Sequence, residues 1–134
     1  RGGQNSTHST RGDAQYTLPL VVLVDGGTAS MGEIFAAAMQ EHGTATVVGT
    51  NTAGSVAAAQ VFGLPDGSGL QVTVFDILSA DGKPLNRVGV VPDEVIEPDA
   101  SDIVTGNDRA LTRAVEILHD QIAAGVGASL PHDP

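Results

Sequence analysis

The 134-residue chain is acidic and poor in aromatic residues: 41% of its residues are hydrophobic, 3% are aromatic, and its formal net charge is −10. Nucleic acid and anionic membrane surfaces are excluded as favourable partners, because both repel a negatively charged chain that has no basic run. The chain has no cysteine and therefore no disulfide, thiolate nucleophile or thiol metal ligand. Its length is that of one domain with a core packed mainly by Val, Ala, Leu and Ile.

The first predicted elements are a strand, a tight turn and a helix. Residues 1–17 read as a polar lead-in. The apolar run from Leu18 to Val24 predicts a strand buried on both faces, and Asp25-Gly26-Gly27 breaks it. Helical spacing follows, with Gly43 placed where a left-handed cap would end the helix. The expected apolar face of this helix comprises Met31, Ile34, Phe35, Ala38 and Met39.

The middle of the chain contains a second strand and a hairpin signature. Ala45–Val48 predicts a buried strand, whereas Thr50–Ala59 could be either an extended lining of a cleft or a permissive loop. The turn sequence Pro65–Gly69 lies between two apolar segments and predicts a β-hairpin. Pro92–Asp102 carries two prolines and several acids, so we expect an extended surface connection.

The last predicted element is an amphipathic helix that begins at an Asn107 or Asp108 cap and ends at Gly125. Its expected apolar residues are Leu111, Ala114, Val115, Leu118 and Ile122. Its expected outer face carries Arg109, Arg113 and Glu116. The predicted organisation is therefore a lead-in over 1–17, one domain over 18–125 and a tail over 126–134.

Ser30 is the position where the predicted fold and the available chemistry coincide. Ligands of α/β sheets collect at the carboxyl ends of strands, and the turn before Ser30 lies at such an end. The first turn of a helix offers free N–H groups and a positive dipole end, which stabilise developing negative charge. Ser30 with Glu33 three residues later is also the pattern of a capping box, in which both side chains serve only the helix end. These residues alone leave both interpretations open.

The stretch from Gly26 to Ile34, followed by Ala36 to Gln40, resembles the nucleophile segment of the C-terminal processing (tail-specific) serine peptidases. The resemblance continues through Ala45–Gly49, Leu64–Ser68 and Val88–Asp93, without a gap from about Leu18 to Val95. It implies an α/β fold that has a mixed sheet with flanking helices and a crotonase and Clp-protease-like ββα core. The match begins inside the family's catalytic domain, so we expect an incomplete fold without its upstream strands, PDZ module and second oxyanion glycine.

The resemblance assigns Ser30 as the nucleophile and the backbone N–H of Met31 as one oxyanion donor. Family members with a serine–lysine dyad carry the lysine in a Phe-Gly-Lys-Gly segment, which here reads Ala53-Gly54-Ser55-Val56. Ser55 therefore stands at the position of the lysine. A hydroxyl of ordinary pKa cannot replace a desolvated amine as the base. The only lysine, Lys83, lies in a predicted exposed turn.

The implied activity is that of a serine-type endopeptidase, a hydrolase that cleaves peptides or unfolded proteins near their C-termini. The resemblance also implies an extracytoplasmic location: periplasm, cell envelope or secreted. No metal or other cofactor is expected, because the four histidines lack the short spacing of ligands. The alternative is an inactive relative that acts as a peptide-binding or assembly module. In either case the incomplete sheet would have an exposed edge, which predicts a homo-oligomer or a strand-swapped assembly. A crotonase-like acyl-transfer or hydrolase domain is a third interpretation.

Overall fold

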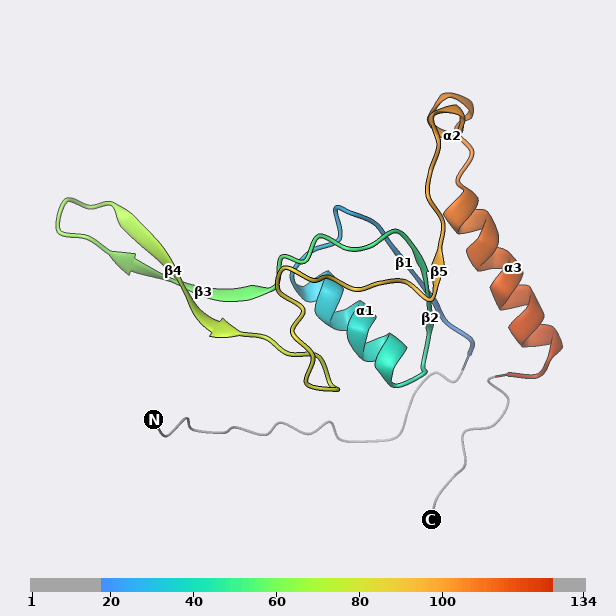
Figure 1. The fold of residues 1–134 in the computed structure, drawn as a ribbon, viewed down its shortest axis with the longest axis horizontal. Coiled ribbons are helices and arrows are strands. Elements are labelled where there is room, and N and C mark those ends of the chain that lie inside the picture. The colour runs from blue at the N-terminus through green and yellow to red at the C-terminus, as the bar shows by residue number, and fades with distance from the viewer. Residues whose placement is uncertain (1–17, 127–134) are drawn as a thin grey trace, which may run out of the picture.

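The structure is a computed structural model that describes residues 18–126, so the predicted lead-in and residues 127–134 lie outside the described residues. A three-stranded parallel sheet has the order β1-β2-β5, and two further strands form a separate antiparallel hairpin. The strands are β1 (Val21–Val24), β2 (Thr46–Gly49), β3 (Ala57–Gly63), β4 (Gly69–Asp76) and β5 (Glu94–Val95). The helices are α1 (Met31–Glu41), α2 (Ala100–Thr105) and α3 (Arg109–Ala123). Figure 1 shows α1 and α3 on opposite sides of the parallel sheet. The α/β class is confirmed, with strands of both orientations.

The core lies between α1 and the parallel sheet. Ala36 and Ala37 are buried on α1, and their small side chains let the helix approach the buried Val47 of β2 closely. The cluster is completed by Val24, Val56, Leu85 and Val90. Residues from the loops before β3 and β5 thus pack with the β1-α1-β2 unit, which brings the segment after β2 against the start of α1.

The predicted strand, turn and helix are all present, but two burial predictions for them are wrong. Strand β1 is shorter than expected and is not buried on both faces, because Leu23 is 45% exposed and Leu18 is 78% exposed. Helix α1 buries Glu33, Ala36 and Ala37, whereas Met31 is 69% exposed and Phe35 is 50% exposed. The helix is rotated in this way because the buried carboxylate of Glu33 has hydrogen-bond partners on that side.

Strand β2 is buried as predicted, and its last residue has a steric reason to be glycine. Gly49 has φ +136°, and a Cβ added there would lie 1.8 Å from the carbonyl oxygen of Val24. The two residues are register partners in the parallel ladder between β1 and β2. The close contact therefore fixes the carboxyl end of the sheet, directly beside the turn that leads to α1. Gly43, with φ 62°, follows α1 as the predicted left-handed cap.

The predicted hairpin is present and extends away from the rest of the protein (Figure 1). Strand β3 begins at Ala57. The segment Thr50–Ala59, for which the sequence left two interpretations, is therefore a loop whose last residues belong to β3. The register pairs Phe62 with Leu70, and Val72 follows on the same face of β4, before a bulge that leaves Val74 without a register partner. All residues of β4 are exposed. The outer edges of both strands are unpaired within residues 18–126, and association through a sheet edge stays a prediction.

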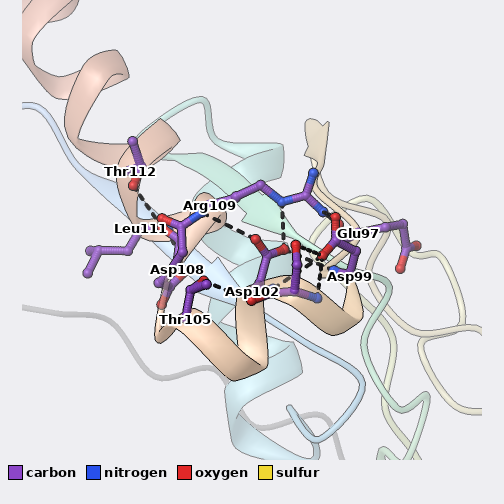
Figure 2. A network of polar contacts seen from close by, with 10 residues as sticks. Glu97, Asp99, Asp102, Thr105, Asp108, Arg109, Leu111 and Thr112 are labelled. Carbon is purple, nitrogen blue, oxygen red and sulfur yellow. Dashed lines mark hydrogen bonds and ion pairs between the residues drawn. The ribbon is translucent and has the colours of Figure 1, made fainter.

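The prediction of an extended connection over Pro92–Asp102 is wrong in its second half. The segment contains β5 and the start of α2, and Asp102 is only 8% exposed. The Asp102 carboxylate accepts hydrogen bonds from the N–H of Asp99 and from the Arg109 Nε, at 2.9 and 2.7 Å, which compensates for its burial (Figure 2). The Arg109 guanidinium also donates to the carbonyl oxygen of Glu97.

Helix α3 begins after Asp108, one of the two predicted caps, whose carboxylate accepts from the Leu111 N–H at 2.8 Å (Figure 2). The expected apolar set is partly wrong, because Ala114 and Ile117 are the buried residues while Leu111, Val115 and Ile122 are exposed. Arg109 and Arg113 do not simply line the outer face, since ion pairs with Asp102 and Glu94 hold them against neighbouring elements. Within residues 18–126, no helix combines the length and apolar character that crossing a membrane requires.

Candidate active site

The turn between β1 and α1 is held by the side chain of Asp25. Its Oδ1 atom accepts hydrogen bonds from the Gly27 N–H at 2.9 Å and from the Thr28 hydroxyl at 3.2 Å. The Thr28 carbonyl oxygen in turn accepts from the Ala53 N–H at 2.9 Å. The turn is therefore held by its own hydrogen bonds and by one hydrogen bond to the loop that follows β2. Together they set the direction in which the backbone reaches Ser30.

Ser30 has an unusual backbone conformation for a residue with a side chain, with φ 53° and ψ −120°. Such a conformation costs roughly 1–3 kcal/mol and persists only where the surroundings determine it. Here the Ser30 N–H donates to the carbonyl oxygen of Ser55 at 3.0 Å and to Glu33 Oε2 at 3.2 Å. A strained, exposed serine on a sharp turn from strand to helix has the arrangement of a nucleophile elbow.

The Ser30 hydroxyl is not used to cap α1. Ser30 and Glu33 have both members of a capping box in place, with the Ser30 side chain at the Glu33 N–H and the Glu33 carboxylate at the Ser30 N–H, but the Ser30 hydroxyl does not reach cap hydrogen-bond geometry. The Glu33 N–H donates instead to the Ser30 carbonyl oxygen at 3.1 Å. Both members of the capping arrangement are thus in place, and the hydroxyl makes no cap hydrogen bond that an attack on a substrate would have to break.

Met31 offers the free backbone donor of the site. It is the first residue of α1, and its N–H has no hydrogen-bond partner among residues 18–126. The neighbouring Ser30 N–H is already used twice, so it cannot serve an incoming ligand without losing those bonds. A negative charge that develops beside Ser30 would therefore meet the Met31 N–H and the positive end of the helix dipole.

Glu33 is the residue that the sequence interpretation underrated. Its side chain has no solvent exposure, yet its carboxylate has four donors. Besides Ser30, they are the Thr52 hydroxyl at 2.5 Å, the Gly54 N–H at 2.7 Å and the Ser55 N–H at 2.8 Å. The signal for this role is an acid among the small residues of α1, but helix capping explains that acid equally well.

Ser55 lies beside Ser30, as the resemblance implies for the lysine position. The contact is made by the backbone, since the Ser55 carbonyl oxygen accepts from the Ser30 N–H. The Ser55 residue is exposed, and its hydroxyl has no hydrogen bond within the described part of the chain. The structure therefore brings together both positions of the expected dyad, with a hydroxyl where an amine would act as base.

Lys83 does not fill the role of the base. Its amine forms ion pairs with Asp81 at 2.9 Å and Glu41 at 3.6 Å, in an exposed turn. The hydrogen bond to Asp81 raises the pKa of Lys83 above its ordinary value, which is the opposite of what a general base needs. His42 caps the far end of α1. No group of three His, Asp or Glu side chains in residues 18–126 is placed to hold a metal ion.

A cavity of about 500 Å³ opens at the carboxyl ends of the parallel strands. Asp25, Thr28, Thr50 and Ile96 line it from the sheet side, and Arg109 lines it from α3. Ser30 is not among its lining residues. The cavity therefore reaches the turn before Ser30 at this end of the sheet, without including the serine itself.

The sequence model of peptidase family S41 matches residues 1–96. This chain belongs to that family. It is 35% identical over 135 residues to a carboxyl-terminal-processing protease of Synechocystis sp., in an alignment that covers 98% of this chain and 32% of the relative. A protein of the same name from Picosynechococcus sp. is 41% identical over 96 residues, covering 72% of this chain and 23% of the relative. The chain therefore spans no more than 32% of the length of these two family members.

Two solved structures of peptidases extend the comparison to the fold. A photosystem II C-terminal processing protease is 40% identical, with a TM-score of 0.53 over 60% of this chain and 21% of that one. The tricorn protease is 26% identical, with a TM-score of 0.72 over 78% of this chain and 10% of that one. The family resemblance read from the sequence is confirmed, together with the Clp-type α/β fold that it implied.

Proposed function

We propose that this chain carries the nucleophile of a serine peptidase site, in which Ser30 attacks a peptide carbonyl and the Met31 N–H donates to the developing oxyanion. The observation that carries the proposal is the backbone of Ser30, strained at φ 53° with its hydroxyl free of any cap hydrogen bond. A serine that only capped a helix would need neither feature. Relatives that are named processing proteases support the same reaction class.

The proposed attack forms a bond from Ser30 Oγ to the substrate carbonyl carbon, moves the C=O π pair onto the oxygen beside the Met31 N–H, and releases the hydroxyl proton to hydroxide. Collapse of this adduct breaks the C–N bond and expels the amine, which takes a proton from water. The Ser55 hydroxyl cannot take up that proton near neutral pH, because its conjugate acid is far too strong. Lys83 is held as a charged amine by Asp81 and Glu41. Among residues 18–126 the site thus has a nucleophile and an oxyanion donor without a base, and we expect slow acylation that accelerates with hydroxide concentration.

The test is labelling of the full chain by a fluorophosphonate probe, followed by intact mass and peptide mapping. We expect slow modification of Ser30 that rises with pH, and no modification in Ser30→Ala. Ser55→Lys places an amine at the exposed neighbouring position and should increase the labelling rate by about 10²-fold, the usual scale of general base catalysis. Failure of both the wild-type chain and Ser55→Lys to react at any pH would overturn the proposal.

The second candidate function is a non-catalytic family member that binds peptides. Ser55 at the lysine position is the observation that favours it. In that case the probe labels neither the wild-type chain nor Ser55→Lys, while an extended peptide still binds. Fluorescence anisotropy with a peptide that carries a free C-terminus measures this binding. Labelling separates the two roles, because a peptidase that loses its nucleophile in Ser30→Ala would also still bind the peptide.

The proposed substrates are peptides or unfolded proteins that are cleaved near their C-termini, outside the cytoplasm. The names of the relatives as C-terminal processing proteases, several of them chloroplastic, support this substrate class. Cleavage assays should compare one peptide with a free C-terminus and the same peptide with an amidated C-terminus. A preference for the free carboxylate supports processing from the C-terminus, and equal rates contradict it.

A further inference from the structure

We propose that Glu33 is a positioning residue of the site, whose buried carboxylate holds the backbones of residues 30 and 55 in fixed relation to each other. The proposal rests on the proposed function, since Ser30 is taken there as the nucleophile. Glu33 touches no substrate position and acts only through the residues that it orients. Its role is therefore distinct from helix capping, which would involve Ser30 alone.

The carboxylate divides its two oxygens between two sets of donors. Oε2 accepts from the N–H of Ser30 at 3.2 Å and from the N–H of Ser55 at 2.8 Å. Oε1 accepts from the Thr52 hydroxyl at 2.5 Å and from the Gly54 N–H at 2.7 Å. One oxygen atom thus joins the two positions of the expected dyad, and the other anchors the loop that carries the second position.

Only an ionised carboxylate matches this donor set. It is an acceptor with about four lone-pair sites, and hydrogen bonds to it are roughly twice as strong as neutral ones. A glutamine in the same place has one accepting oxygen, so its NH₂ group would face two N–H or O–H donors in either orientation. Glu33→Gln therefore keeps the size of the side chain while disrupting half of the hydrogen bonds.

The same carboxylate connects to a third segment of the chain through Thr52. The Thr52 hydroxyl donates to Glu33 and accepts from the Val90 N–H at 2.7 Å. The backbones of Thr52 and Val90 are also joined, since the Thr52 N–H donates to the Val90 carbonyl oxygen at 3.2 Å. The loop around residue 55 is thus held from α1 on one side and from the segment before β5 on the other.

Every contact that Glu33 makes with position 55 is a backbone contact. The side chain at that position can therefore change without loss of this hydrogen bond, so a serine is compatible with it where dyad members of the family carry a lysine. It follows that the amine introduced by Ser55→Lys can act as a base for Ser30 only while Glu33 holds the two backbones together. Glu33 thereby determines whether residue 55 can serve Ser30 at all.

The test compares Glu33→Gln with Glu41→Gln in the full chain. Glu41 lies on the same helix, two turns further on, and accepts from the Asp81 N–H outside the site. We expect Glu33→Gln to move the amide proton resonances of Ser30 and Ser55 upfield and to lower the labelling of Ser30 in the Ser55→Lys background by about 10²-fold, because small misplacements of reacting groups cost that much. Glu41→Gln should change neither quantity.

A second pair of variants covers the case in which Glu33→Gln does not fold. Thr52→Val removes the hydroxyl that joins Glu33 to Val90, whereas Thr52→Ser keeps it. We expect slower labelling and shifted Ser30 and Ser55 amides in Thr52→Val, with values close to those of the parent chain in Thr52→Ser. A residue with a merely structural role would lower stability and leave the labelling rate of the folded fraction unchanged, even though the loss of the Oε2 acceptor in Glu33→Gln moves the Ser30 and Ser55 amides directly.

The amide resonances separate the two proposals. If no chain is labelled but Glu33→Gln shifts the Ser30 and Ser55 amides, the proposed peptidase function fails and the positioning of the two residues by Glu33 stands. If labelling in the Ser55→Lys background is equally fast after Glu33→Gln, the positioning role is overturned, whether or not the two amides move, while Ser30 remains the nucleophile.

Discussion

Two adjoining regions of the molecule differ sharply in how they are held. At the junction of α1 with the loop after β2, Glu33 and Val56 have no solvent exposure. One residue later β3 begins, and it continues into a hairpin whose second strand is exposed along its whole length (Figure 1). The site is therefore held by buried hydrogen bonds and by core contacts of the parallel sheet, and not by the hairpin that follows it.

The largest contrast between the regions is expected from two glycine substitutions. In Gly49→Ala the new Cβ would lie 1.8 Å from the Val24 carbonyl oxygen, so β1 and β2 could not stay paired. In Gly67→Ala, at the tip of the hairpin with φ +85°, no atom lies within 4 Å of the new Cβ. We expect no folded protein for the first and a loss of roughly 1–2 kcal/mol for the second. Circular dichroism and urea denaturation measure both, and similar losses would contradict the contrast.

Truncated valines provide a smaller contrast of the same kind. Val47 is fully buried in β2, whereas Val61 in β3 is 65% exposed. Val47→Ala should lower the free energy of unfolding by about 2–3 kcal/mol, from lost burial and the cavity left behind. Val61→Ala should stay within about 0.5 kcal/mol of the parent chain. An effect of Val61→Ala as large as that of Val47→Ala would mean that the hairpin is packed in solution.

Ser30 tests the same comparison from within the site, because its backbone is strained although the residues around it are held by buried hydrogen bonds. Ser30→Gly relieves the φ of 53°, while Ser30→Ala keeps a Cβ in the strained conformation. We expect the glycine variant to be roughly 1 kcal/mol more stable than the alanine variant. Both should be inert to the fluorophosphonate. Equal stabilities in urea denaturation would show that the backbone of Ser30 is not strained.

The smallest effect is expected at the periphery, where Arg113 pairs with Glu94 at 2.6 Å. The hydrogen bond from Arg113 lowers the pKa of Glu94 below its ordinary value. The pair therefore stabilises the fold above the carboxyl's unfolded pKa, and the stabilisation is lost as the pH falls through the lower folded pKa. Unfolding of the parent chain and Glu94→Gln should be compared from about pH 6 to about pH 3. The gap between their stabilities should narrow in acid, and a gap that widens would be inconsistent with the pair.

The sequence predicted most elements of the fold because their signals are local. The run before Asp25, the left-handed Gly43, the turn at Pro65–Gly69 and the Asp108 cap each depend on neighbouring residues only. Burial was predicted less well, since it depends on tertiary partners. Phe35 follows the apolar period of α1 and is still half exposed, whereas the charged Glu33 is buried.

The sequence suggested candidate residues for the site but not their geometry. The resemblance pointed to Ser30, Met31 and Ser55, and these assignments remain predictions. The strained backbone of Ser30 could not be read from the sequence, because it is imposed by hydrogen bonds to Ser55 and Glu33, one of them from a residue 25 positions away in the chain (55 − 30). The four partners of Glu33 come mostly from the loop after β2, which the sequence left open between a cleft lining and a plain loop.

The most direct measurement is a crystal structure of the full chain after reaction with the fluorophosphonate. The account predicts a covalent bond to Ser30 Oγ and a phosphonyl oxygen about 2.7–3.1 Å from the Met31 nitrogen, the range of an oxyanion hydrogen bond. A Ser30 hydroxyl that caps α1 without an adduct, or an adduct whose oxygen points away from Met31, would contradict it.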